Sequence, residues 1–190
     1  MLRGLLRVTD TTTASRGIRF SRRHMSALYT IQRKGDTQFL VAACDLLPGT
    51  ITVQETATAQ AHADMHTIQV AKSLHIDCKG PIRFTNHSCA PNCAMRLEQL
   101  AGSKDQYSVR LVSEQSIARG DLLTFDYATT EWDMAAAFDC GCGSSSCRGQ
   151  ICGFKHLKQK DRQQLISTGL VAEHIMRLRT AADDDNTTAH

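Results

Sequence analysis

Short apolar runs separated by turn residues fill the chain from about residue 29 to about residue 125. Phe39–Ala43 has the length and composition of a strand, and the turn Leu47-Pro48-Gly49-Thr50 leads into a second strand, Ile51–Val53. Residues 54–65 are rich in Ala, Thr and Gln, which predicts a short helix or a surface loop. Further strands are predicted at His66–Val70, Leu74–Ile76, Tyr107–Val112 and Leu122–Phe125.

The hydrophobic period changes after residue 156. Apolar residues then recur at helical spacing, at Leu157, Leu165, Leu170, Val171, Ile175, Met176 and Leu178. A break at Ser167-Thr168-Gly169 divides this stretch, so we expect two short C-terminal helices within residues 157–180. Residues 181–190 contain three consecutive aspartates among small polar residues and are predicted to be a disordered tail. Many short strands with a helical appendage predict a mainly β, or α+β, domain.

Composition narrows the class of protein. A chain of 190 residues that is 42% hydrophobic and 22% charged is typical of one ordinary soluble domain. No apolar run approaches the roughly 20 residues needed to span a bilayer, so an integral membrane protein is not expected. The net charge of +3 is unevenly distributed, because residues 1–25 hold six arginines and one acid while the remainder is slightly acidic. A nucleic-acid binder is therefore disfavoured.

Residues 1–25 are rich in Arg, Ser and Thr and nearly free of acids. This composition is typical of a mitochondrial or plastid transit peptide. The alternatives are a disordered basic tail or a translation start at Met25, with a nuclear or cytoplasmic protein as the result. Under each alternative we expect this leader to lie outside the fold.

Three cysteines lie within eight residues, as Cys140-Gly-Cys142-Gly-Ser-Ser-Ser-Cys147. Structural zinc takes four ligands, so a fourth must come from elsewhere, and Cys89 in a polar, turn-rich segment is suited to provide it. A disulfide framework is not expected without a secretory signal. The other four cysteines form no recognisable ligand set and are interpreted as buried or incidental thiols; they are Cys44, Cys78, Cys93 and Cys152.

Three segments carry a resemblance to a known family. They are Arg83-Phe84-Thr85-Asn86-His87-Ser88-Cys89-Ala90-Pro91-Asn92, then Gly120-Asp121-Leu122-Leu123-Thr124-Phe125-Asp126-Tyr127, then the cysteine triple. Together they resemble the SET-domain protein-lysine methyltransferases with a post-SET zinc segment, in a compact subgroup without a pre-SET region. The resemblance covers roughly residues 30–154.

The resemblance implies a β-clip-like SET fold of knotted short sheets. It implies a SET domain at residues 26–138, a post-SET zinc segment at residues 139–156, and C-terminal helices behind it. It also implies that S-adenosyl-L-methionine donates a methyl group to a lysine side chain. Zinc held by all four thiolates would close the post-SET segment over the site; these are Cys89, Cys140, Cys142 and Cys147.

Individual roles follow from the same resemblance. Tyr127 places its phenol at the transfer point, where it orients the amine and contacts the methyl group of the cofactor. Phe125 lies where the family carries Phe or Tyr, and a Phe predicts a product beyond monomethyl-lysine. Asn86 and His87 match the pair that binds the cofactor, through side chains or adjacent backbone. Trp132 either covers the cofactor or anchors the closing segment.

Two positions depart from the family pattern. The usual Gly-x-Gly near the first strand is reduced to Gly35 alone, so part of the cofactor site is unassigned. His66 stands where a channel Tyr is expected. A histidine there predicts either an activity that rises with pH or a substrate other than an ordinary lysine.

The expected partner is a protein whose lysine lies in a short extended segment, bound as an added strand, with no nucleic acid and no membrane. A monomer is expected. The alternative to an enzyme is a catalytically silent SET-fold module that binds a peptide or the cofactor.

Overall fold

The computed structural model describes residues 27–187, so the predicted leader at residues 1–25 lies outside the described residues. The strands, in chain order, are β1 Tyr29–Lys34, β2 Thr37–Ala42, β3 Ile51–Gln60, β4 Thr67–Ala71, β5 Leu74–Asp77, β6 Asn86–His87, β7 Cys93–Gln99, β8 Gln106–Ser113, β9 Thr124–Phe125, β10 Phe138–Asp139 and β11 Gln150–Ile151. Three short 3₁₀ helices and two α-helices complete the fold: η1 Pro81–Phe84, η2 Tyr127–Thr129, η3 Phe154–His156, α1 Gln159–Ser167 and α2 Glu173–Thr187.

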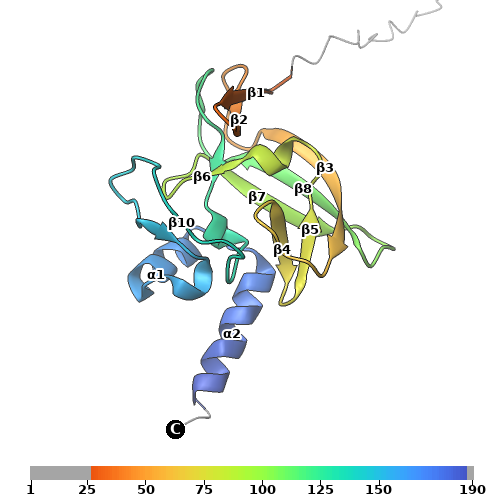
Figure 1. Cartoon of the computed structure of the whole chain (residues 1–190), viewed down its shortest axis with the longest axis vertical. Coiled ribbons are helices and arrows are strands. Elements are labelled where there is room, and N and C mark those ends of the chain that lie inside the picture. Colours follow the sequence, from red (N-terminus) through yellow and green to blue (C-terminus); the bar gives the residue numbers. More distant parts are fainter. Residues whose placement is uncertain (1–26, 188–190) are drawn as a thin grey trace, which may run out of the picture.

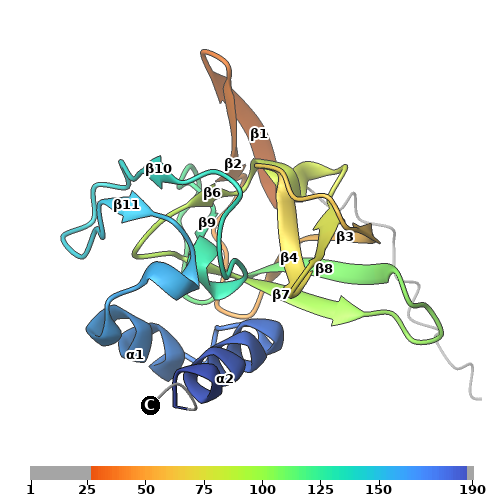
Figure 2. The ribbon, with the colours of Figure 1, turned by 60° about the horizontal axis from the view of Figure 1, so that its bottom comes forward.

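The strands of residues 27–187 form four small sheets. The largest has five antiparallel strands in the order β4-β5-β3-β8-β7, and its buried side chains form the main hydrophobic core. The β1–β2 hairpin projects from the body, and β10 pairs with β11 on the side where β6 and β9 lie (Figures 1 and 2). The mainly β architecture with C-terminal helices is confirmed.

Strand β3 overturns one prediction. Residues 54–60 were expected to form a helix or loop, but they extend the strand that begins at Ile51. The reason is pairing on both sides, since β3 lies between β5 and β8 and Thr58 faces a partner in each. A register shift between Ile51 and Val53 also places two consecutive buried residues in the strand, which hides its alternation.

A second, smaller core lies under the C-terminal helices. Phe154 and Ile175 are fully buried there, packed with Ala128 and Leu165. The predicted break between the two helices is present, because α1 ends at Ser167 and α2 begins at Glu173.

Helix α2 runs further than expected. It continues to Thr187, whereas a disordered tail was predicted from residue 181 (Figure 1). Ala181 and Ala182 favour helix, and Arg179 pairs with Asp183 one turn later, with Nε and Oδ2 3.3 Å apart. Helix α2 therefore continues through the three consecutive aspartates of the predicted tail.

The remaining differences concern short or missed strands. The strand expected at Leu122–Phe125 is reduced to Thr124–Phe125, with Leu122 in an isolated bridge to Val41. Five strands were not predicted: β1, β6, β7, β10 and β11. None of the helices that the structure describes combines the length and apolar character needed to cross a membrane.

Candidate active site and metal centre

Two motif segments meet in the parallel pair of β6 and β9. Asn86 faces Thr124 and His87 faces Phe125, although about forty residues separate the strands in the chain. The backbone N–H of Ser88 extends the pairing by donating to the Phe125 carbonyl at 3.1 Å. This pairing sets the Asn-His segment beside the segment that ends at Tyr127.

Tyr127 is held at this junction by both its backbone and its side chain. Its hydroxyl donates to the carbonyl of Thr85 at 2.9 Å, and its N–H donates to Nδ1 of His87 at 3.2 Å. Burial, reinforced by the nearby Glu131, raises the pKa of the phenol to about 12. The phenol therefore stays protonated at neutral pH and keeps its role as a donor.

Three rings surround that of Tyr127. The ring centroids of Phe125, His87 and Phe138 lie 4.8, 5.2 and 6.0 Å from it. Phe138 also contacts His87, at 5.9 Å and nearly perpendicular. We call these four side chains the ring cluster. Sequence reasoning missed Phe138, and the available signal was an aromatic residue placed two positions before Cys140 in a chain with few aromatics.

His87 uses both ring nitrogens inside the protein. Because Nδ1 accepts the N–H of Tyr127, the neutral ring carries its proton on Nε2, which lies 3.3 Å from Sγ of Cys89. Burial lowers the pKa of His87 to about 4 despite the nearby carboxylate of Asp126. A contact between His87 and a cofactor must therefore go through its backbone.

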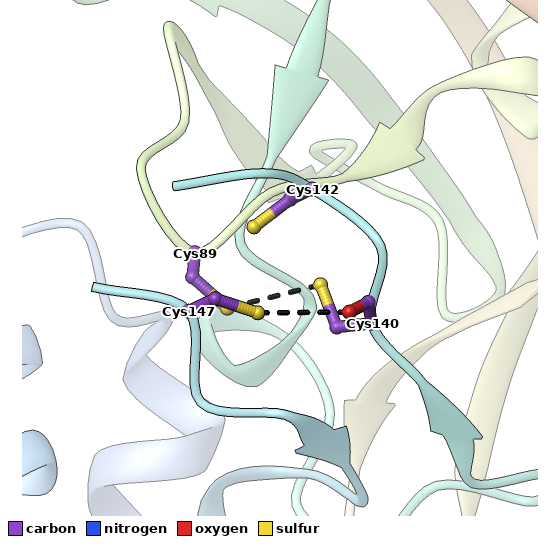
Figure 3. A group of neighbouring side chains, drawn as sticks. All are labelled: Cys89, Cys140, Cys142 and Cys147. Atoms are coloured by element: carbon purple, nitrogen blue, oxygen red, sulfur yellow. Dashed lines mark hydrogen bonds between the residues drawn. The ribbon is translucent and has the colours of Figure 1, made fainter. Parts of the chain in front are cut away.

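The four predicted metal ligands converge. The sulfur atoms of Cys89, Cys140, Cys142 and Cys147 all lie within 4.8 Å of one another and turn toward a shared centre (Figure 3). We call them the cysteine cluster. Cys89 follows β6, whereas the other three come from the loop between β10 and β11, so the cluster joins two distant parts of the chain.

The cluster fits a tetrahedral zinc ion. Zinc–sulfur bonds of about 2.3 Å place the sulfurs of a tetrahedron about 3.8 Å apart, and Cys89 and Cys140 already lie 4.0 Å apart. Backbone N–H groups of Cys89 and Ser144 lower the pKa of Cys142 to about 6, whereas burial raises that of Cys140 to about 12. A bound cation would supply the positive charge that keeps all four as thiolates.

Arg148 and Asp126 form a buried ion pair beside the cluster. Nη2 of Arg148 lies 2.5 Å from Oδ1 of Asp126. The backbone N–H of Arg148 also donates to Sγ of Cys89 at 3.4 Å. Sequence reasoning gave Arg148 no role, although it directly follows the last cysteine of the triple.

Trp132 lies in the second core. Its ring stacks on Phe154 with centroids 5.9 Å apart, and its backbone N–H donates to Oε1 of Gln69 at 2.8 Å. Gly153 packs so closely that an added Cβ would lie 2.7 Å from the Trp132 carbonyl oxygen. These contacts favour Trp132 as the anchor of the closing segment. Its alternative role, covering the cofactor, stays a prediction.

The structure does not bring His66 to the ring cluster. This residue lies in the exposed turn before β4, where its N–H donates to Oδ1 of Asp64 at 2.7 Å. Asn86, by contrast, is half-buried beside the ring cluster and forms no side-chain hydrogen bond within residues 27–187. The role predicted for His66 as a channel residue therefore has no support in its position.

Glu131 is an acid that sequence reasoning passed over. Its Oε1 accepts the N–H of Gln69 at 3.0 Å and the hydroxyl of Thr130 at 3.2 Å. Burial nevertheless raises its pKa to about 7. Glu131 therefore titrates near neutral pH, and it lies close enough to Tyr127 to raise the pKa of the phenol.

The remaining cysteines belong to no metal group within the described residues. Cys78 and Cys93 are buried in the main core, as the interpretation as small buried thiols requires. Cys44 and Cys152 are half-buried.

Comparison with known proteins agrees with this arrangement. The family model for the SET domain matches residues 8–128. Methyltransferase flvH of Aspergillus flavus is 33% identical over 129 residues, covering 66% of this chain and 68% of that protein. Histone-lysine N-methyltransferase ASHH2 of Arabidopsis thaliana is 39% identical over 95 residues, covering 50% of this chain and 5% of that protein.

A third relative is the H3 lysine-4 specific histone-lysine N-methyltransferase of Aspergillus fumigatus, 39% identical over 71 residues that cover 37% of this chain and 6% of that protein. The chain thus spans only a small part of the last two relatives. Fold and site define a small β protein closed by a cysteine-rich segment. The chain belongs to the SET-domain family of methyltransferases.

Proposed function

We propose that the protein transfers methyl groups from S-adenosyl-L-methionine to a lysine side chain of a protein. The observation that carries this proposal is the position of Tyr127. Its phenol is fixed by the Thr85 carbonyl within the ring cluster, where segments from β6, β9 and β10 meet. Family membership and the named relatives support the same reaction class.

The ring cluster suits a lysine amine that must react as the neutral form. When bound, S-adenosyl-L-methionine supplies a methyl group on a positively charged sulfur. The ordinary pKa of lysine is about 10.4, and apolar surroundings disfavour the ammonium ion. Phe125, Phe138 and the protonated Tyr127 provide such surroundings and offer no negative charge that would hold the ammonium.

Unpaired polar groups beside the ring cluster fit the cofactor. Asn86 is a half-buried residue whose side-chain amide forms no hydrogen bond with any residue that the structure describes. Oγ1 of Thr85 is buried without a partner in the same segment. Because buried polar groups are normally hydrogen-bonded, Oγ1 of Thr85 is a candidate to bind a polar part of the cofactor, and the adjacent Asn86 amide could add a second contact. His87 would add a backbone contact.

Zinc in the cysteine cluster would hold the closing segment in place. Residues 139–156 then form the post-SET segment behind the SET domain at residues 26–138. Phe138 stands immediately before this segment and contacts both Tyr127 and His87. The cysteine cluster would therefore influence the candidate active site by fixing the position of Phe138.

The product and the partner can be narrowed in the same way. Phe125 is 5% exposed and packs against Tyr127 with no hydroxyl to hold a water molecule, so we expect products beyond monomethyl-lysine. The expected partner is a protein segment that binds in extended form, and we expect a monomeric enzyme that needs no nucleic acid.

The proposal is tested with zinc-loaded protein, S-adenosyl-L-methionine carrying a labelled methyl group, and a cell lysate as substrate. We expect label on lysine in the wild-type reaction and a loss of roughly 100-fold or more in Tyr127→Phe. Tyr107→Phe in β8 is the matched control and should keep the wild-type rate. Cofactor binding without transfer to any protein would instead identify a silent module and refute the proposal.

A further inference from the structure

Arg148 contacts the cysteine cluster and the Tyr127 segment at the same time. It directly follows Cys147, and its backbone N–H donates to Sγ of Cys89. Its guanidinium pairs with Asp126 and also interacts with the thiol of Cys89, and the side chains of Arg148 and Asp126 are only 13% and 2% exposed. One residue therefore spans the distance between the metal ligands and the ring cluster.

Asp126 organises the backbone that carries Tyr127. Its Oδ1 accepts the N–H of Ala128 at 3.1 Å, and its carbonyl accepts the N–H of Thr129 at 2.9 Å. These bonds cap η2, whose first residue is Tyr127. The orientation of Tyr127 thus depends on the position of the Asp126 carboxylate.

Arg148 is the cation that balances this carboxylate. Nδ1 of His87 lies 3.7 Å from Oδ1 of Asp126, but it already accepts the N–H of Tyr127 and has no proton to donate. Within residues 27–187, Arg148 is the one Lys or Arg paired with Asp126. A buried carboxylate that loses its cation is strongly destabilised, so Asp126 would move toward water.

We propose that Arg148 is a positioning residue that couples the cysteine cluster to Tyr127. When the cluster is closed, Cys89 and Cys147 hold the Arg148 backbone where its side chain reaches Asp126. When the cluster opens, Asp126 loses its counter-charge and the cap of η2 weakens. The reverse also holds, because loss of the ion pair frees the segment that carries Cys147. The catalytic part of this inference rests on the function proposed above.

The test compares Arg148→Ala and Arg148→Lys with Arg96→Ala, which removes the partly exposed ion pair between Arg96 and Glu114. All variants are prepared loaded with zinc. The first readout is the rate of zinc transfer to a chelator, which requires no activity. The second is kcat and KM for methyl transfer, and the third is amide hydrogen exchange at residues 127–131.

We expect Arg148→Ala to release zinc about 10- to 100-fold faster than wild type, as for other residues that support metal ligands. Its kcat should fall by a similar factor while KM for the cofactor changes little, because Tyr127 is misplaced rather than lost. Hydrogen exchange at residues 127–131 should accelerate. Arg148→Lys should recover part of both losses, since it restores the charge without the planar fork. Arg96→Ala should match wild type.

Zinc release from Arg148→Ala at the rate of Arg96→Ala would overturn the coupling. Faster zinc release with unchanged hydrogen exchange at residues 127–131 would also overturn it, because the cluster would then act alone. If Arg148→Ala does not fold, Arg148→Lys decides, and wild-type values for both zinc release and exchange refute the proposal. If the wild-type protein transfers no methyl group, the proposed function fails, while zinc release and hydrogen exchange still test the coupling.

Discussion

Gly153 offers the sharpest test of how the C-terminal segment docks on the SET domain. Its φ angle of +105° lies in the region that favours glycine, and a Cβ there would lie 2.7 Å from the carbonyl oxygen and 2.9 Å from the carbonyl carbon of Trp132. Both neighbours are backbone atoms, held because Trp132 O accepts the N–H of Lys155 at 2.9 Å. Neither can move away without breaking the docking contact.

The expected cost of Gly153→Ala has two parts. With φ +105° and ψ +172°, Gly153 lies in a backbone region that only glycine commonly adopts, and another residue there costs about 1–3 kcal/mol. Forcing a methyl group into a packed site adds about 1–3 kcal/mol. We therefore expect the free energy of unfolding to fall by about 2–6 kcal/mol. Gly102→Ala is the matched control, since Gly102 has a φ of +80° but nothing within 4 Å of the added Cβ.

The assay is urea denaturation at fixed excess zinc, followed by the fluorescence of the single tryptophan, Trp132. Because Trp132 stacks on Phe154 beside Gly153, its emission should also change in the folded Gly153→Ala protein. Gly102→Ala should lose only the backbone cost and keep the wild-type emission. Equal destabilisation by both variants would refute the close approach of the two backbones.

Three further outcomes are expected. Cys142→Ser should abolish stoichiometric zinc binding, whereas Cys44→Ser should not; stoichiometric zinc in Cys142→Ser would refute the four-cysteine site. Phe138→Ala should lower kcat/KM about tenfold through lost ring contacts with little effect on stability, and a wild-type kcat/KM would contradict this role. Burial raises the pKa of Glu131 from 4.5 to about 7. Between these two pH values, the folded protein keeps a proton on Glu131 that the unfolded chain has already lost. Glu131 therefore lowers stability progressively as pH rises through that window, by on the order of 3 kcal/mol once above it. Relative to wild type, Glu131→Gln should gain stability between pH 5 and pH 8 in denaturation curves, and parallel pH profiles would exclude the raised pKa.

Sequence reasoning succeeded where local pattern and structure coincide. Phe39–Ala43 and Tyr107–Val112 lie almost entirely within β2 and β8, because their apolar runs are long enough to be read without partners. The four metal ligands were also predicted and converge, since three of them share one short loop. Residues 54–60 could not be predicted in this way. Their strand depends on partners on both sides, which only the folded sheet provides.

The site shows the same limit. Asn86, His87 and Tyr127 were expected together and lie together, because their motifs form the paired strands β6 and β9 and the turn that follows. His66 was assigned by its place in the chain, but the turn before β4 leaves it exposed. The roles proposed for Phe138 and Arg148 rest on contacts between residues that are not neighbours in the chain. Phe138 contacts the ring of Tyr127, and Arg148 pairs with Asp126. No spacing in the sequence indicates those contacts.

The proposed lysine methylation can be tested by mass spectrometry of proteins from the native source, with and without the gene. We expect at least one protein whose lysine carries two or three methyl groups only when the gene is present. This mark should return with the wild-type gene but not with Tyr127→Phe. Unchanged lysine methylation across the compared proteins, or a gene-dependent mark on another residue type, would contradict the proposal.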